Sequence, residues 1–150
     1  MCLDKEHTEE KRKEILEKAN GEGYKVFSEV DGKLRAPMSK GKTFGTGRWL
    51  NEKNYREKGE KQDFLYYDDE KNRHLFYPTG WHVFLTLDGA IRFTKNYINY
   101  HSIIKKVKFR KVVKVGLNYN SDCIVAKEIL VMKDEVKLQE NFYFITTRKR

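Results

Sequence analysis

Two polar residues, His82 and Glu128, interrupt apolar runs of the sequence, and either side chain could take part in catalysis or ligand binding. His82 lies in the apolar run Trp81–Leu85, just before a helical pattern, so its imidazole could be a general acid or base, or could bond a ligand hydroxyl. The alternative is a half-buried histidine satisfied by the backbone. The remaining histidines, His7, His74 and His101, show no spacing typical of a metal site, and we expect no metal.

Glu128 is the second such residue, because it interrupts the apolar run Ile124–Val131. A carboxylate in a central strand must be paired or must face a cleft. By alternation Lys127 points to the opposite side, so we do not expect it to be the partner. The alternative is that Glu128 lies on an open face of the sheet. His82 and Glu128 are therefore the candidate catalytic residues if the protein is an enzyme.

The glycine-rich loop Met38–Gly47 contains Gly41-Lys42-Thr43, which matches the end of a phosphate-loop motif. That motif also needs a glycine where Ala36 stands, and a strand leading in, which Pro37 closes. Residues 45–50 lack the third glycine of a dinucleotide-binding turn. We therefore predict no cofactor here, but a basic loop that could contact phosphates.

Basic residues outnumber acidic ones by 31 to 22, which gives a formal net charge of +9. With a period of two, residues 103–115 have one mostly apolar face and one basic face. Such a surface favours polyanionic partners: nucleic acid, a nucleotide or a nucleoprotein complex. The alternative is a lysine-rich composition without a binding role, since Lys and Glu are interspersed. The predicted polyanion-binding residues are Lys40, Lys42, Arg48, Trp49, Lys106, Lys108, Arg110 and Lys114.

The first elements that must position these residues are a helix and a hairpin. Residues 4–20 contain favourable i,i+4 ion pairs but only a thin apolar stripe, so we predict a peripheral helix. Tyr24–Val30 alternates as a strand. Asp31-Gly32 is typical of a two-residue hairpin turn and predicts a return strand over 33–36.

A polar insertion and a strand–helix unit follow. Residues 51–74 predict an inserted polar hairpin with a charged tip. Trp81–Leu85 predicts a strand that leads into a helix ending near Asn99. Thr86 or Asp88 would be the N-cap of that helix.

The last part of the chain predicts the longest strands. Residues 103–115 would form one strand, or two with a break near Phe109-Arg110, and residues 116–122 would form a polar loop. Residues 123–132 are apolar on both faces, as in a central strand. We therefore expect one α+β domain over residues 1–150, with a mainly antiparallel sheet of about seven short strands and about two helices.

Short motifs in this order resemble two groups of proteins. Gly80-Trp81-His82-Val83-Phe84, followed by the helix start Asp88–Ala90, is similar to the Gly-x-His strand and Asp-x-Ala helix of small phage and prophage proteins of unassigned function. The same piece, together with the late strand around Glu128, resembles ADP-ribosyltransferases, in which a late-strand glutamate is catalytic. Those enzymes usually have tyrosine where His82 stands, and the Arg or His of their first strand is absent from Tyr24–Val30.

The net charge, the basic strand face and the incomplete catalytic sets lead us to expect a non-enzymatic binding protein without a cofactor. The phage resemblance implies a small accessory protein that counters host defence by binding nucleic acid, a nucleotide or a nucleoprotein complex. One alternative is an ADP-ribosyl or glycosyl transferase-like enzyme that uses His82 and Glu128. Another is a protein-directed inhibitor or scaffold, which could be a homo-oligomer.

The cysteine pattern and the hydropathy of the chain predict its cellular compartment. Cys2 and Cys123 do not form a C-x-x-C pair, and two isolated cysteines fit a reducing cytosol. No apolar run approaches the length of a membrane span, and no signal peptide precedes the first strand. We therefore expect a cytoplasmic protein of a bacterial host, without a membrane partner.

Overall fold

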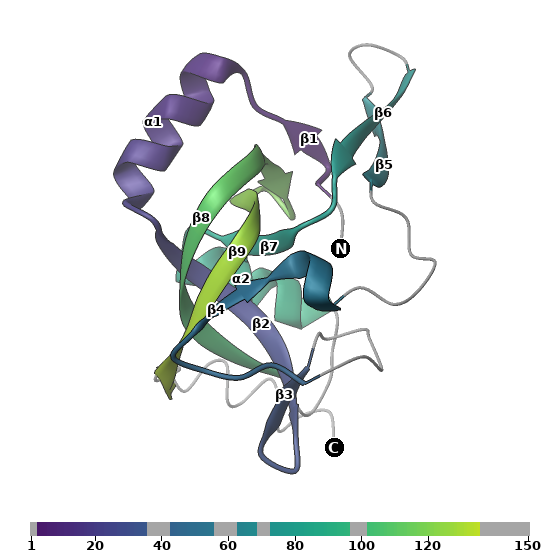
Figure 1. Ribbon diagram of the computed structural model, residues 1–150. Helices are drawn as coiled ribbons and strands as arrows, with labels where there is room; N and C mark the ends of the chain where they lie inside the picture. The colour runs from purple at the N-terminus through teal and green to yellow at the C-terminus, as the bar shows by residue number, and fades with distance from the viewer. Residues whose placement is uncertain (1–2, 36–42, 56–62, 69–72, 97–101, 136–150) are drawn as a thin grey trace.

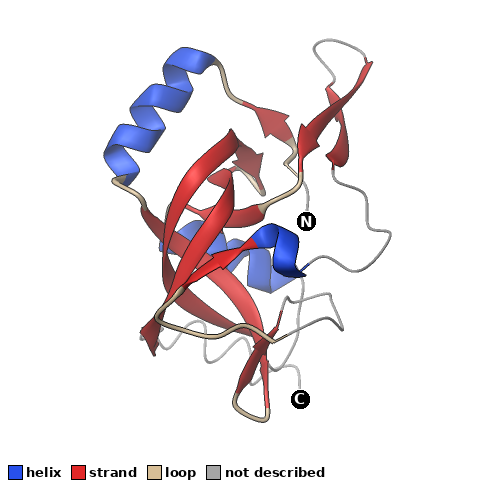
Figure 2. Ribbon diagram, in the orientation of Figure 1, coloured by secondary structure: helices blue, strands red, loops and turns tan. Residues whose placement is uncertain are grey.

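The computed structural model describes residues 3–35, 43–55, 63–68, 73–96 and 102–135. These residues form one α+β domain with a seven-stranded sheet and two α-helices (Figure 1). Every strand pairing among them is antiparallel. The predicted fold class is therefore confirmed, and strands make up most of the described chain (Figure 2).

The elements differ greatly in length. The strands of the large sheet are β1 (Lys5–Glu6), β2 (Glu22–Val30), β3 (Lys33–Arg35), β4 (Trp49–Asn51), β7 (Trp81–Phe84), β8 (Ser102–Asn118) and β9 (Ser121–Glu135). A separate two-stranded sheet consists of β5 (Asp63–Asp68) and β6 (Arg73–Pro78). The helices are α1 (Glu9–Ala19), α2 (Leu87–Asn96) and the short 3-10 helix η1 (Glu52–Tyr55).

Four strands close into a ring, in which β8 pairs with β2 and β9, while β7 pairs with β9 and meets β2. The β-sheet pairing between β2 and β7 consists of a single residue pair, Tyr24 with Phe84. Because successive side chains of a strand point to opposite sides, each strand supplies two cores. Phe27, Val83 and Val107 belong to the inner core, and Ala90 and Phe93 of α2 cover the outer one.

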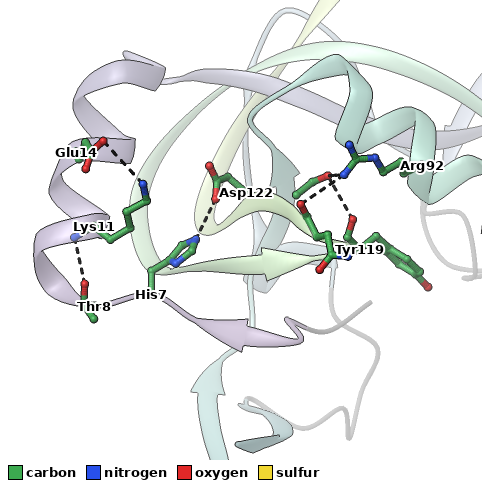
Figure 3. A network of polar contacts seen from close by, with 9 residues as sticks. His7, Thr8, Lys11, Glu14, Arg92, Tyr119 and Asp122 are labelled. Atoms are coloured by element: carbon green, nitrogen blue, oxygen red, sulfur yellow. Dashed lines mark hydrogen bonds and ion pairs between the residues drawn. The ribbon is translucent and has the colours of Figure 1, made fainter. Parts of the chain in front are cut away.

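Helix α1 begins later than predicted, because the residues before it pair as a strand. Lys5 and Glu6 pair with Leu117 and Gly116 at the end of β8, so the predicted start at residue 4 is wrong. Thr8 caps the helix instead, and its hydroxyl accepts a hydrogen bond of 3.3 Å from the backbone N–H of Lys11 (Figure 3). Ile15 is the buried residue of this helix, in agreement with its thin apolar stripe.

The predicted polar loop over 116–122 is also wrong, since β8 and β9 are joined by the two-residue turn Tyr119-Asn120. Both turn residues have positive φ, 52° and 57°, the conformation that matches the twist of the paired strands. Arg92 of α2 donates to the hydroxyl of Ser121 at 3.1 Å, and the His7 ring lies 2.9 Å from Asp122 (Figure 3). These contacts attach α2, and the segment just before the N-cap of α1, to the start of β9.

Strand β8 is continuous and has no break near Phe109-Arg110. Its register with β9 shifts at two other places, between Lys105 and Val107 and between Val112 and Lys114, and next to the second shift Lys111 has a φ of 58°. A bulge of this kind rotates the side chains that follow it, so the simple two-face pattern predicted for residues 103–115 does not continue through it.

Other predicted elements are present. The Asp31-Gly32 turn has φ values of 54° and 75°, and β2 pairs with β3 across it. The paired strands β5 and β6 lie within and just beyond the predicted polar insertion. The hydroxyl of Thr86 accepts from Gly89 N at 3.1 Å and so caps α2, whose predicted end near Asn99 lies outside the described residues. None of the described helices is long and apolar enough to cross a membrane.

Candidate nucleic-acid interface

Three neighbouring strands, β4, β9 and β8, present a row of polar and aromatic side chains opposite the inner core. Trp49 and Lys108 both pair with Leu130, and Asn51 and Arg110 both pair with Glu128. The alternate residues of the same strands, Leu50, Phe109 and Ile129, belong to the inner core. Alternation therefore directs the first set outward, and we call it the outer strip. It consists of Trp49, Asn51, Lys108, Arg110, Glu128 and Leu130.

The guanidinium of Arg110 is the centre of the outer strip. Its carbon lies 3.9 Å from the centre of the Trp49 ring, and its Nε donates a hydrogen bond of 2.8 Å to Glu128 Oε1. The two strands that carry Arg110 and Trp49 lie on either side of β9, so the arginine side chain crosses β9 to reach the indole. Although it is held from two sides, the Arg110 side chain is 48% exposed. It is thus a fixed, planar cation at the surface.

Glu128 is nearly buried and fully paired. Its carboxylate accepts from Arg110, from Lys111 Nζ at 3.1 Å and from Asn51 Nδ2 at 3.3 Å, while only 11% of its side chain is exposed. The hydrogen bonds from Arg110, and then those from Lys111, hold the pKa of Glu128 below its usual value of 4.5. Of the two predicted alternatives for this carboxylate, pairing or facing a cleft, the structure shows pairing.

Sequence reasoning missed Asn51 and Lys111 as partners of Glu128. Lys111 was predicted on the core face of its strand, but its positive φ turns it outward, where 63% of its side chain is exposed. The sequence did not single out Lys111, because Lys105 stands in the same predicted column and is buried. For Asn51 no signal was available, because its strand has only three residues.

The short strand β4 is held in place from the inner core, and this positions Trp49. Trp81 Nε1 donates a hydrogen bond of 3.1 Å to the Leu50 carbonyl. Gly47 N bonds to the Val131 carbonyl at 2.8 Å, just before the strand begins. Leu50 is only 2% exposed, so its side chain anchors the strand in the inner core. Trp49, its neighbour, lies half-buried on the opposite side of the strand.

The predicted polyanion-binding residues do not form one patch. Lys106 and Lys108 alternate with buried residues of β8 and continue the row of Arg110, although Lys106 lies 3.3 Å from Glu22. Lys114 lies beyond the bulge and pairs with Glu6 of β1. Arg48 is exposed, but its Nε would lie only 3.1 Å from a Cβ on Gly45, so it folds toward its own loop. Lys40 and Lys42 lie outside the described residues.

His82 is a buried structural residue with a defined hydrogen-bond chain. Leu3 N donates to the Tyr77 hydroxyl at 2.9 Å, and that hydroxyl lies 3.1 Å from His82 Nε2. The Tyr77 hydroxyl then has a proton to donate to Nε2, an arrangement that suits a neutral ring with Nε2 unprotonated. Burial, and then the nearby Lys25, lower the pKa of His82 well below 6.5, which agrees with that state. The histidine is more buried than expected, with 3% exposed.

His82 and Glu128 are not brought together. The hydrogen bonds and ion pairs of Glu128 go to Arg110, Lys111 and Asn51 within the described chain. His82 packs beside Tyr77, which belongs to the core beneath α2. The two residues that the transferase resemblance implies therefore serve different parts of the molecule.

A buried lysine and a buried thiol lie in the same region as His82. Lys25 is only 7% exposed, its Nζ donates to the His82 carbonyl at 2.8 Å, and burial lowers its pKa to about 8. Burial raises the pKa of the Cys123 thiol to about 12, so the free thiol is protonated and unreactive near neutral pH. In the part of the chain that the structure describes, no three His, Cys, Asp or Glu side chains gather where they could share a metal ion.

Comparison of the chain with family models, with curated proteins and with solved structures gave no match.

Proposed function

We propose that this protein binds nucleic acid through the outer strip and the adjoining Lys106. The observation that carries the proposal is the stack of the Arg110 guanidinium on Trp49, 3.9 Å apart, on an exposed face of the sheet. Phosphate groups favour arginine and lysine as partners, and nucleobases favour planar side chains on which they can stack. One strip of three strands supplies both kinds of group.

The electrostatics of the strip support an anionic partner. Side chains of Lys108, Arg110 and Lys111 are exposed near two carboxylates: that of Glu128, which is itself covered by its partners, and that of Glu22, which lies across from Lys108 on β2. Among the described residues, the Lys108 side chain has no hydrogen bond or ion pair. Both side chains of the ion pair between Lys106 and Glu22 are exposed. Because exposed ion pairs contribute little to the free energy of folding, Lys106 can exchange Glu22 for a phosphate.

The proposal is tested by titrating a labelled oligonucleotide of mixed sequence at two salt concentrations. Affinity should fall as salt rises, because bound phosphates release counterions. Lys108→Ala should weaken binding and reduce the salt slope by about one. Lys33→Ala is the matched control, since it removes an exposed lysine beside Val30, at the opposite end of β2 from the residue that pairs with Lys108. Salt-insensitive binding, or equal effects of the two variants, would contradict the proposal.

The tryptophans provide a second readout. Trp49 is half-buried beside Arg110, whereas Trp81 is buried and donates its indole N–H to Leu50. Binding at the outer strip should change the fluorescence of Trp49 and leave that of Trp81 unaltered. A signal that persists in Trp49→Leu would place the ligand elsewhere.

The other predicted activities remain predictions. The transferase-like alternative predicts NAD turnover that is lost in Glu128→Gln, and the inhibitor or scaffold alternative predicts a stable protein complex in sizing chromatography. The phage accessory role is likewise a prediction from resemblance, and a pull-down from the host would test it.

A further inference from the structure

The plane of the Arg110 guanidinium has one covered side and one exposed side. The Trp49 ring covers one side, and Glu128 occupies the edge at Nε. The side chain is nevertheless 48% exposed, so the part of it that neither Trp49 nor Glu128 contacts is open to solvent. Within the described ranges, the hydrogen bonds, ion pairs and ring contacts of Arg110 go to Trp49 and Glu128 alone. Its Nη donors have no partner among these residues.

A guanidinium fixed in this way can accept a nucleobase on its open side. Unpaired bases stack on arginine planes as they do on aromatic rings, and the terminal N–H groups can reach a phosphate of the same strand. Duplex nucleic acid keeps its base faces inside the helix and cannot use such a platform. The arrangement therefore favours single strands, with Lys108 next along β8 to bind the backbone.

Glu128 determines whether Arg110 stays on the indole. A long arginine side chain at a surface has several rotamers, and ordering it has an entropic cost. Glu128 is itself held by Lys111 and Asn51, so it is a fixed acceptor for Arg110 Nε at 2.8 Å. A carboxylate would otherwise be unfavourable beside a polyanion, and its position is understandable if it orients the arginine.

We propose that the outer strip binds single-stranded nucleic acid, that one base stacks on the open side of the Arg110 guanidinium, and that Glu128 is the positioning residue that holds this guanidinium on Trp49. The inference rests on the proposed nucleic-acid binding and specifies its ligand. The stack then has three layers: indole, guanidinium and base.

The first test needs no variant. Three labelled oligonucleotides are compared by anisotropy at one salt concentration: a single strand, the same strand as a duplex, and a single strand with abasic sites in place of its bases. The wild type should bind the normal single strand about tenfold more tightly than the abasic strand, because stacking of one base contributes about that factor. It should also bind the duplex more weakly than the single strand.

Two variants test the roles of the residues. Arg110→Lys retains the charge but loses the plane, so it should bind normal and abasic strands about equally. Glu128→Gln removes a negative charge near a polyanion, and a purely electrostatic role would strengthen binding. A positioning role predicts the opposite for the normal strand: weaker binding, and a smaller preference for the normal strand over the abasic strand. Circular dichroism and thermal unfolding verify that both variants are folded.

The outcomes separate this inference from the proposed function. Salt-dependent binding that is equal for normal, abasic and duplex oligonucleotides would overturn the inference and leave nucleic-acid binding intact. Stronger binding by Glu128→Gln would overturn the positioning role. Absence of salt-dependent binding to all three oligonucleotides would overturn the proposed function itself.

Discussion

The ammonium group of Lys25 donates a hydrogen bond of 2.8 Å to the carbonyl of His82, across the opening between β2 and β7. These strands share only one pair, Tyr24 with Phe84, and separate beyond it. A buried carbonyl needs a hydrogen-bond donor, because leaving it without one is costly. Lys25 supplies the donor, at the expense of burying an amine between Phe27 and Trp81.

We expect Lys25→Met to become more harmful as the pH rises. The folded-state pKa of Lys25 is about 8 and its ordinary value is 10.5, so between these values the unfolded chain binds more protons, and the folded state gains stability with rising pH. The variant lacks this gain. The free energy of unfolding of the variant should therefore fall relative to wild type by about 2 to 3 kcal/mol between pH 7 and pH 10.

Urea denaturation of both proteins at several pH values measures this difference. The Cys123 thiol titrates in both chains, with a folded-state pKa of about 12, so its opposite effect largely cancels in the comparison. A difference between the two proteins that does not change with pH would show that Lys25 is not a desolvated amine.

Acid should destabilise the protein through His82 at a pH below 6.5. Its folded-state pKa lies well below this ordinary value, so the unfolded chain gains a proton that the folded chain does not, and stability falls as the pH decreases. The loss approaches about 1.4 kcal/mol per pH unit for one proton. His82→Gln should have a smaller slope between pH 6.5 and pH 5. Tyr77→Phe is the control, because it removes the hydrogen bond and keeps the titrating ring; equal slopes in wild type and His82→Gln would refute the assignment.

The stabilisation that the ion pairs of Glu128 provide should be lost in a separate and lower pH range. The folded-state pKa of Glu128 is lower than 4.5, so its contribution is complete above that pH and is lost as the pH falls through the folded-state value. The stability difference between wild type and Glu128→Gln should therefore be constant near neutral pH and shrink below pH 4.5. Thermal unfolding of both proteins between pH 3 and pH 7 measures it. A difference that already shrinks near pH 6 would indicate another group.

Gly116→Ala should detach β1 from β8. A Cβ at this position would lie 2.1 Å from the Lys5 carbonyl oxygen, which is far inside van der Waals contact. We expect a cost of about 1 to 3 kcal/mol from this overpacking. Hydrogen exchange should quicken at the amides of Asp4 and His7, which bond to the carbonyls of Leu117 and Val115.

Gly32→Ala is the control for this exchange experiment. Gly32 has nothing within 4 Å of an added Cβ, but its φ of 75° disfavours alanine, so this variant should also lose stability. It should leave the Asp4 and His7 amides protected, because the strain is confined to the β2–β3 turn. Protected amides in Gly116→Ala would mean that β1 tolerates the added methyl group.

Local patterns in the sequence were sufficient for the elements whose determinants lie close together in the chain. The turn at Asp31-Gly32 follows from two residues that accept positive φ. The N-cap of α2 was narrowed to Thr86 or Asp88, and the structure selects Thr86. The long apolar strand through Val125 follows from composition alone. The α+β class follows from the sum of these elements.

What the tertiary structure decided is which distant residues meet. Cross-strand register places Glu128 between Asn51 and Arg110, and no local signal specifies a register between strands that are dozens of residues apart. The bulge at Lys111 ends the predicted basic face, and it separates Lys114 from the outer strip. His82 was the leading candidate for a catalytic residue, but its burial beside Tyr77 makes it structural. The stack of Arg110 on Trp49 depends on an arginine side chain that crosses a third strand. Sequence determines which side chains are available on each strand, but pairing and register determine their neighbours.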